Sequence, residues 1–238
     1  LLFCNPHNPA GRVWRRDELE RVSDICRRHH VRVIADEIHC ELVMPGYEYT
    51  PFASLSDETS AITVTLNSPS KSFNTAGLMQ SNVICSDIEM RRRVDRVINI
   101  FEVCEVNPFG PDALVAAYNE SEEWLDELNR YLYDNYLELK RFFAEYMPKI
   151  EVLKLEGTYL VWVDISALEF TSDELEAKLR DEGKVYLNSG TMYGRRAGQG
   201  YMRINIACPR SRMIDGLTRM AKVLAPYMED DCDMGCPA

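Results

Sequence analysis

Three side chains that could act together chemically each follow a short run of residues with the pattern of a strand. They are Asn8, Asp36 and Lys71, and the lysine lies in the segment Ser68-Pro-Ser-Lys71-Ser-Phe-Asn74. A lysine amine can form a Schiff base with an aldehyde, and a carboxylate can keep a ring nitrogen protonated. Taken alone, such a lysine is usually a solvated surface amine, so the elements around it decide between the two interpretations.

The elements before these residues predict that they meet at one edge of a parallel sheet. Residues 1–4, 31–35 and 62–66 have the pattern of buried strands, and residues 15–30 have apolar positions along one helical face. A strand, a helix and a second strand in this order form a right-handed parallel crossover, and ligands bind at the carboxyl ends of such strands. We therefore expect the three side chains at one crevice, although a buried ion pair would gather the same groups.

The turn Asn5-Pro-His-Asn8-Pro-Ala-Gly11 is dense in residues that restrict the backbone. Pro6 and Pro9 disfavour helix in the residues before them, so we expect Asn5 and Asn8 to be extended, with their amides aimed away from the strand. The ordinary alternative is a loop whose asparagines satisfy its own backbone.

The pattern changes in the second half of the chain. Residues 121–147 repeat apolar side chains every three or four positions and predict a long helix. Beyond it, the sequence predicts strands at 151–155, 158–165, 185–187 and 201–207 and helices at 171–183 and 210–224. The expected fold class is α/β: the remainder of a large domain with a mixed, mainly parallel sheet at 1–125, a connecting helix at 126–147, and a smaller α+β domain at 148–238 with an acidic tail.

The composition argues against several kinds of partner and binding site. The 238 residues carry a formal net charge of −11, which argues against nucleic acid because phosphate binding needs clustered Lys and Arg. The eight cysteines lack paired CxxC spacing, so we expect free thiols in a reducing, cytoplasmic compartment and no metal site. No apolar run is long enough to span a bilayer, so no membrane partner is expected. The acidic residues 229–231 and Asp233 have the composition of a solvated tail, and Cys232 and Cys236 lie in the same stretch.

Four sequence blocks carry a family resemblance, through their order as well as their residues. They are residues 5–11, Asp36-Glu-Ile-His39, Ser68-Pro-Ser-Lys71 and Met202-Arg-Ile-Asn-Ile-Ala207. Together they resemble the fold-type I pyridoxal-phosphate enzymes of the class I/II aminotransferase group over nearly the whole chain. The family's amino-terminal portion, with its glycine-containing phosphate loop and ring-stacking aromatic residue, has no counterpart here. The chain also opens inside a predicted strand, so we expect it to be the part after the amino-terminal third of a longer polypeptide.

The resemblance implies a role for each residue that matches a family motif. Lys71 would bind the aldehyde of pyridoxal 5'-phosphate as a Schiff base and move the substrate's Cα proton. Asp36 would bind the pyridine nitrogen of the cofactor, and Asn8 its phenolic oxygen. The resemblance also implies a homodimer, because the family's sites lie at a subunit boundary.

Three further residues take their expected roles from the same resemblance. Ser68, with Ser70 as a second candidate, would bind the cofactor's phosphate. Arg203 would bind the α-carboxylate of a small amino-acid substrate, a task that suits a planar guanidinium. A surface-strand arginine is the alternative for Arg203, and its place within an apolar strand argues against that alternative.

Two departures separate this chain from typical aminotransferases. His39 stands where those relatives have a tyrosine and is kept as a candidate for cofactor contact, and Met79 stands where they have an arginine. With these residues the chain resembles the carbon–sulfur lyase branch, enzymes similar to cystathionine β-lyase. The resemblance implies a lyase that releases thiol, pyruvate and ammonia from cystathionine or cysteine S-conjugates. An aminotransferase on the same scaffold and a truncated, cofactor-free interaction module stay open as alternatives.

Overall fold

The computed structural model describes residues 1–228, and within them the chain divides into two units. The first unit comprises Leu1–Arg130 together with Glu156–Thr158, and the second comprises Tyr131–Leu155 and the chain from Tyr159 onward. The acidic tail with Cys232 and Cys236 lies outside the described residues. The three-part division expected from the sequence, with boundaries at 125 and 147, stays a prediction.

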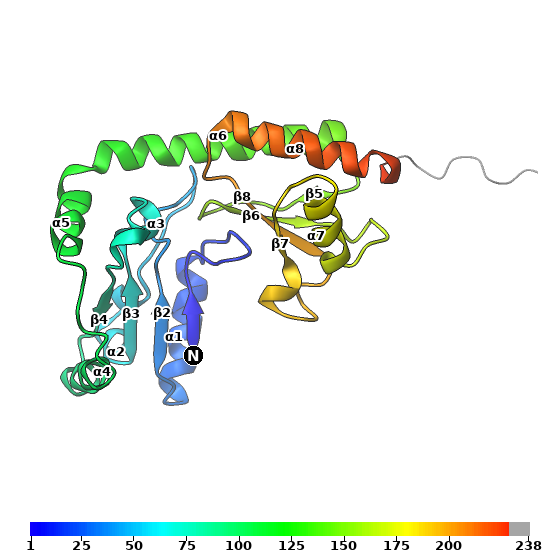
Figure 1. The fold of residues 1–238 in the computed structure, drawn as a ribbon. Coiled ribbons are helices and arrows are strands. Elements are labelled where there is room, and N and C mark those ends of the chain that lie inside the picture. Colours follow the sequence, from blue (N-terminus) through cyan, green and yellow to red (C-terminus); the bar gives the residue numbers. More distant parts are fainter. Residues whose placement is uncertain (229–238) are drawn as a thin grey trace, which may run out of the picture. The chain divides into compact units, whose positions relative to one another are not determined.

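The sheet of the first unit has the strand order β1-β2-β3-β4 (Figure 1). Its strands are β1, Leu2–Cys4, β2, Val33–Asp36, β3, Thr63–Asn67, and β4, Asn82–Ile84. The first three are parallel neighbours, whereas β4 runs antiparallel to β3. The register pairs Cys4 with Asp36 and Asp36 with Leu66, so the parallel strands end side by side. The predicted mixed, mainly parallel sheet is confirmed.

A helix joins the first two strands and completes the predicted crossover. This helix is α1, Arg16–Arg28, which lies beside β1 and β2 in Figure 1. Acidic residues occupy its first turn and basic residues its last turn, which suits the helix dipole. Burial of its apolar face against the sheet stabilises the crossover. The shared core consists of Phe3, Leu19, Cys26, Val33, Ala35 and Phe52.

Most of the other helices of the first unit are short. They are η1, Phe52–Ser54, α2, Asp57–Ala61, α3, Pro69–Ser72, η2, Ala76–Leu78, α4, Ile88–Ile100, and α5, Gly110–Glu120. The sequence pattern did not predict α2, because five residues are too few to show a helical period. Ser56 starts this helix as its N-cap by accepting a hydrogen bond from the Thr59 backbone N–H.

A long helix leads from the first unit into the second. It is α6, Glu122–Tyr146, and the division between the units falls within it, after Arg130. Among residues 1–228, no helix is long and apolar enough to cross a membrane. Figure 1 shows how α6 follows α5 along the chain.

The sheet of the second unit is antiparallel, with the strand order β5-β6-β8-β7. Its strands are β5, Glu151–Val152, β6, Leu160–Asp164, β7, Asn188–Ser189, and β8, Tyr201–Asn205. Its helices after α6 are α7, Ser172–Asp181, η3, Gly190–Tyr193, α8, Arg210–Leu224, and η4, Ala225–Tyr227. The predicted strand at 185–187 is wrong, because β7 begins at Asn188, where it pairs with Arg203 of β8.

A three-residue segment late in the chain belongs to the first unit. The backbone N–H groups of Glu156 and Gly157 both donate to the Gly11 carbonyl, over 2.7 and 3.0 Å. The Glu156 carboxylate in turn accepts from the Val13 backbone N–H over 3.0 Å. This segment therefore holds the carboxyl end of the turn that carries Asn8.

Gly157 lies where a larger residue has no space. A Cβ at this position would lie 2.8 Å from Val13 Cγ2 and 3.0 Å from both the Leu42 carbonyl oxygen and Pro6 Cβ. We therefore expect Gly157→Ala to lower the free energy of unfolding by about 1–3 kcal/mol, measured by denaturant unfolding of the full-length protein. Gly216→Ala, in α8, is the control, because a Cβ there meets nothing within 4 Å and alanine favours a helix interior. Equal losses in the two variants would contradict the close packing at Gly157.

Candidate active site

The carboxyl edge of the first sheet gathers the residues that the sequence singled out for chemistry. Asn8 lies in the turn after β1, Asp36 is the last residue of β2, and Lys71 lies in α3, just after β3. Because the three strands are parallel neighbours, all three residues stand at the same edge. Each of them is half-buried. The edge therefore offers a ligand an amide, a carboxylate and an amine.

Two carboxylates that follow one another at the end of β2 have opposite surroundings. Glu37 is 3% exposed, and its oxygens accept from the Tyr49 hydroxyl over 2.5 Å and from the Phe52 backbone N–H over 2.8 Å. Burial raises the pKa of Glu37, and these two hydrogen bonds act against the rise. Asp36 is half-buried and accepts from the Ile38 backbone N–H over 3.3 Å. Glu37 thus ties down the following loop, and Asp36 is the carboxylate that a ligand can reach.

Cys4 lies next to this edge as a protonated thiol. Burial raises its pKa, the charge of Asp36 adds to the rise, and the Asn8 backbone N–H acts against it. Its Sγ donates to the Pro6 carbonyl over 3.4 Å. Within residues 1–228, no group of three or more His, Cys, Asp or Glu side chains could hold a metal ion. The edge thus presents an amine, a carboxylate and an amide beside a protonated thiol.

The two serines predicted to bind a phosphate differ in their surroundings. Ser68 is the N-cap of α3: its Oγ accepts from the Ser70 backbone N–H over 3.0 Å and donates to the Gln80 carbonyl over 2.5 Å. A hydroxyl has one proton to donate, so Ser68 has none left for a phosphate in this conformation. The Ser70 hydroxyl is half-buried and makes no hydrogen bond to other described residues. Of the two, Ser70 is the better placed phosphate donor.

The two residues that depart from aminotransferase motifs lie in different environments. His39 is buried in the turn after β2, where its backbone carbonyl accepts from the Leu42 N–H over 2.9 Å. Met79 is 83% exposed, with a left-handed φ of 53°. A thioether carries no charge with which to bind a phosphate. Met79 therefore offers no charged group to a phosphate.

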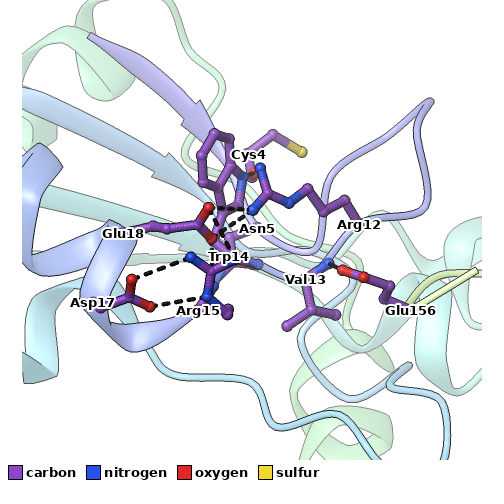
Figure 2. A network of polar contacts seen from close by, with 9 residues as sticks. All are labelled: Cys4, Asn5, Arg12, Val13, Trp14, Arg15, Asp17, Glu18 and Glu156. Carbon is purple, nitrogen blue, oxygen red and sulfur yellow. Dashed lines mark hydrogen bonds and ion pairs between the residues drawn. The ribbon is translucent and has the colours of Figure 1, made fainter.

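The expectation that Asn5 turns its amide outward is wrong. Asn5 is completely buried, and its Oδ1 accepts from the Trp14 backbone N–H over 3.1 Å, as Figure 2 shows. Its Nδ2 donates to the Thr50 carbonyl over 3.3 Å. The Trp14 indole N–H also donates to the Cys4 carbonyl over 3.1 Å. Asn5 therefore holds the turn in place, whereas Asn8 is half-buried at the edge of the sheet.

Charged side chains continue this network onto the start of α1 (Figure 2). Arg12 Nη2 donates to both carboxylate oxygens of Glu18 over 2.5 Å. The Arg12 guanidinium carbon lies 4.4 Å from the centre of the Trp14 ring, a distance suited to a cation–π contact. The hydrogen bond from Arg12 lowers the pKa of Glu18. The carboxyl end of the turn is thus attached both to α1, through Arg12, and to Glu156, through Val13.

In the second unit, two side chains hold the guanidinium of Arg203. Its Nη2 donates to Asn188 Oδ1 over 2.8 Å, and its Cζ lies 4.9 Å from the centre of the Tyr193 ring. Tyr193 packs edge-on against Trp162, with 5.8 Å between ring centres. Arg203 is half-buried rather than a free surface arginine. A planar guanidinium fixed in this way is shaped to bind a carboxylate through two N–H donors.

The segment that carries Tyr193 is tied to α7 by one carboxylate. Asp173 accepts from the hydroxyls of Ser189 and Thr191, each over 2.5 Å. These hydrogen bonds lower the pKa of Asp173. The sequence did not signal this anchor or the contact between Asn188 and Arg203, because both join residues that are distant along the chain.

Comparisons with known proteins show the family. A sequence model described as aminotransferase class I and II matches residues 1–219, so the chain belongs to this family. Cystathionine β-lyase PatB of Bacillus subtilis is 40% identical over 225 residues, which cover 94% of this chain and 58% of PatB. The aspartate aminotransferase of Pyrococcus horikoshii is 24% identical over 229 residues, covering 94% of this chain and 56% of that protein.

A solved structure shows the same fold. Cystalysin of Treponema denticola, whose crystal structure contains pyridoxal 5'-phosphate, is 36% identical with a TM-score of 0.92, over 95% of this chain and 57% of cystalysin. The predicted family and fold class are thus confirmed. The chain spans a little over half the length of the curated relatives it matches.

The burial of Glu37 predicts how the free energy of unfolding depends on pH. Because its pKa is raised, the folded protein keeps this proton to higher pH than the unfolded chain. Its contribution to stability is therefore greatest at low pH and declines as the pH rises above about 4.3, the ordinary pKa of glutamate. Glu37→Gln removes this decline, so the free energy of unfolding should fall less between about pH 4.3 and 7 than in the wild type, in denaturant titrations at a series of pH values.

The control for this experiment is Glu48→Gln, because Glu48 is an exposed glutamate on the same loop. Its pH profile of stability should follow that of the wild type. Parallel profiles for all three proteins would show that Glu37 titrates normally in the folded state.

Proposed function

We propose that the protein is a pyridoxal-phosphate-dependent carbon–sulfur β-lyase that releases thiol, pyruvate and ammonia from cystathionine or related cysteine S-conjugates. The observation that carries the proposal is the placement of Asn8, Asp36 and Lys71 at one edge of a parallel sheet. The relative named cystathionine β-lyase is more similar to this chain than the aspartate aminotransferase is, which supports the lyase over a transaminase.

The side chains at this edge fit the polar groups of pyridoxal 5'-phosphate. Lys71 offers an amine to the aldehyde carbon, Asp36 a carboxylate to the ring nitrogen, and Asn8 an amide to the phenolic oxygen. Ser70 offers a hydroxyl to the phosphate, and buried His39 stays a candidate for contact with the ring. The donor set thus contains a group of suitable charge for each of these groups. When bound, the cofactor supplies an electrophilic carbon and a ring that accepts the electron pair from the substrate's Cα.

The proposed reaction assigns three tasks to residues of this chain. Lys71 would hold the cofactor and would take the proton from the substrate's Cα. Asp36 keeps the proton on the ring nitrogen. Arg203 binds the substrate's α-carboxylate. Loss of the Cα proton allows the β-thiolate to leave, and one water molecule converts the remaining three-carbon fragment to pyruvate and ammonia.

An aminotransferase is the second candidate, because the same residues would bind the cofactor and remove the Cα proton. The two activities differ in where the proton returns and in whether a leaving group departs from Cβ. Buried His39 and exposed Met79, in place of a tyrosine and an arginine, favour the lyase. A cofactor-free interaction module is a third candidate.

Product analysis tests the proposal. The full-length protein, supplied with pyridoxal 5'-phosphate and cystathionine, should form pyruvate and a thiol without any added 2-oxo acid. Lys71→Ala should lower kcat at least about 10²-fold, because it removes the base that takes the Cα proton, and should abolish the visible absorbance of the bound cofactor. Lys222→Ala, at an exposed position of α8, is the control and should leave both unchanged.

Each alternative has its own outcome in this assay. Product that forms only when an amino acceptor is supplied would identify an aminotransferase. Absence of cofactor absorbance in the wild-type protein would favour the interaction module. Arg203→Lys should raise KM about tenfold through loss of the paired donors, and an unchanged KM would reject its role as carboxylate receptor.

We further propose that the protein is a homodimer in a reducing, cytoplasmic environment and binds no nucleic acid. Four apolar side chains that are more than half exposed lie along the chain from the end of α4 to the start of α5, and exposed apolar surface is typical of contacts with another protein: Ile100, Phe101, Val103 and Phe109. The six cysteines among residues 1–228 are all free thiols, which supports a reducing environment. Sedimentation of the full-length protein should give a dimer, and an active monomer would contradict this proposal.

A further inference from the structure

A carboxylate in the turn after β2 organises the surroundings of α3. One oxygen of Glu41 accepts from the Ser72 hydroxyl over 2.5 Å. The charge of this carboxylate also acts on the Tyr118 hydroxyl, on α5, and on the Cys40 thiol. The backbone carbonyl of Glu41 accepts from Asn129 Nδ2 over 2.9 Å. Glu41 therefore joins segments of the first unit that are distant along the chain.

Ser72 connects this carboxylate to Lys71. The two residues are neighbours in α3, which has only four residues. Ser72 is completely buried, whereas Lys71 is half-buried. A helix this short has little stability of its own, so the direction of the lysine depends on what holds the helix in place. A hydrogen bond from Ser72 to a charged acceptor is a strong anchor for this purpose.

Aromatic packing fixes the same end of α3. The Phe73 ring lies 5.5 Å from the Tyr118 ring in an edge-on contact and 5.9 Å from the Trp124 ring in a stacked one. Burial, together with the charge of Glu41, raises the pKa of Tyr118 and of Cys40. Both groups therefore keep their protons at neutral pH.

We propose that Glu41 is a positioning residue for Lys71: by accepting the Ser72 hydroxyl, it holds α3 in the orientation that presents the lysine amine at the sheet edge. The inference rests on the proposed function, because that function gives the orientation of Lys71 its catalytic value. A carboxylate suits the position because both of its oxygens can accept a hydrogen bond. An amide in its place has only one oxygen that can accept.

The first measurement does not depend on the cofactor. In the full-length protein without pyridoxal phosphate, Glu41→Gln and Ser72→Ala should each speed hydrogen–deuterium exchange of residues 68–74 at least about threefold, because α3 opens more often. Glu48→Gln, at an exposed position, is the matched control and should exchange like the wild type. Ser72→Ala leaves Glu41 itself intact, so it tests the contact even if Glu41→Gln fails to fold.

The second measurement uses the protein loaded with pyridoxal phosphate. Misplacement of the lysine should lower kcat about tenfold in Glu41→Gln while KM stays within about twofold, because substrate binding is not altered. The visible circular dichroism per bound cofactor should also change, since it reports how the cofactor is held. The double variant Glu41→Gln/Ser72→Ala should lose no more activity than the worse single variant, because both remove one interaction.

The outcomes separate this inference from the proposed function. Unchanged exchange, dichroism and kcat in both single variants, with only a lower melting temperature, would overturn the positioning role. Additive losses in the double variant would overturn it as well. If the wild type lacked lyase activity, the proposed function would fail, and the exchange measurement would still decide whether Glu41 holds α3.

Discussion

The first unit depends on the register of three short parallel strands, which end side by side at one edge of the sheet. Because Cys4 pairs with Asp36, and Asp36 with Leu66, the turns that follow these strands all leave the sheet at this edge. These strands have three, four and five residues, so little of their pairing extends into the turns. The turns need anchors of their own, and buried polar side chains supply them.

Each of the three turns pairs an anchored polar residue with an accessible one. Asn5, Glu37 and Ser68 are buried, and each makes two hydrogen bonds to the surrounding chain. Leaving such a group without partners would cost about 1–3 kcal/mol, so these bonds strongly restrict the turn. A second polar residue in or beside each turn then keeps a defined position while staying half-buried: Asn8, Asp36 and Lys71.

This division also explains what the sequence could predict. The strands, the crossover and the common edge were predictable, because β-branched runs and turns rich in Pro, Asn and Gly are local signals. The burial of Asn5 was not, since its partners Trp14 and Thr50 are defined only in the folded chain. The two-residue strand β7 has no period of its own and exists through its pairing with β8. The chemical roles of the edge residues came from the family resemblance rather than from local pattern.

The place of Glu156–Thr158 in the first unit has a consequence for how the chain folds during synthesis. The bond between Val13 and Glu156 spans 143 positions, so the turn that carries Asn8 leaves the ribosome long before its last partner. Closing so long a loop costs conformational entropy, which the packed segment has to offset. The order in which segments are synthesised therefore differs from the order in which they reach their folded structure. An early turn reaches its final form only after a late segment has been translated.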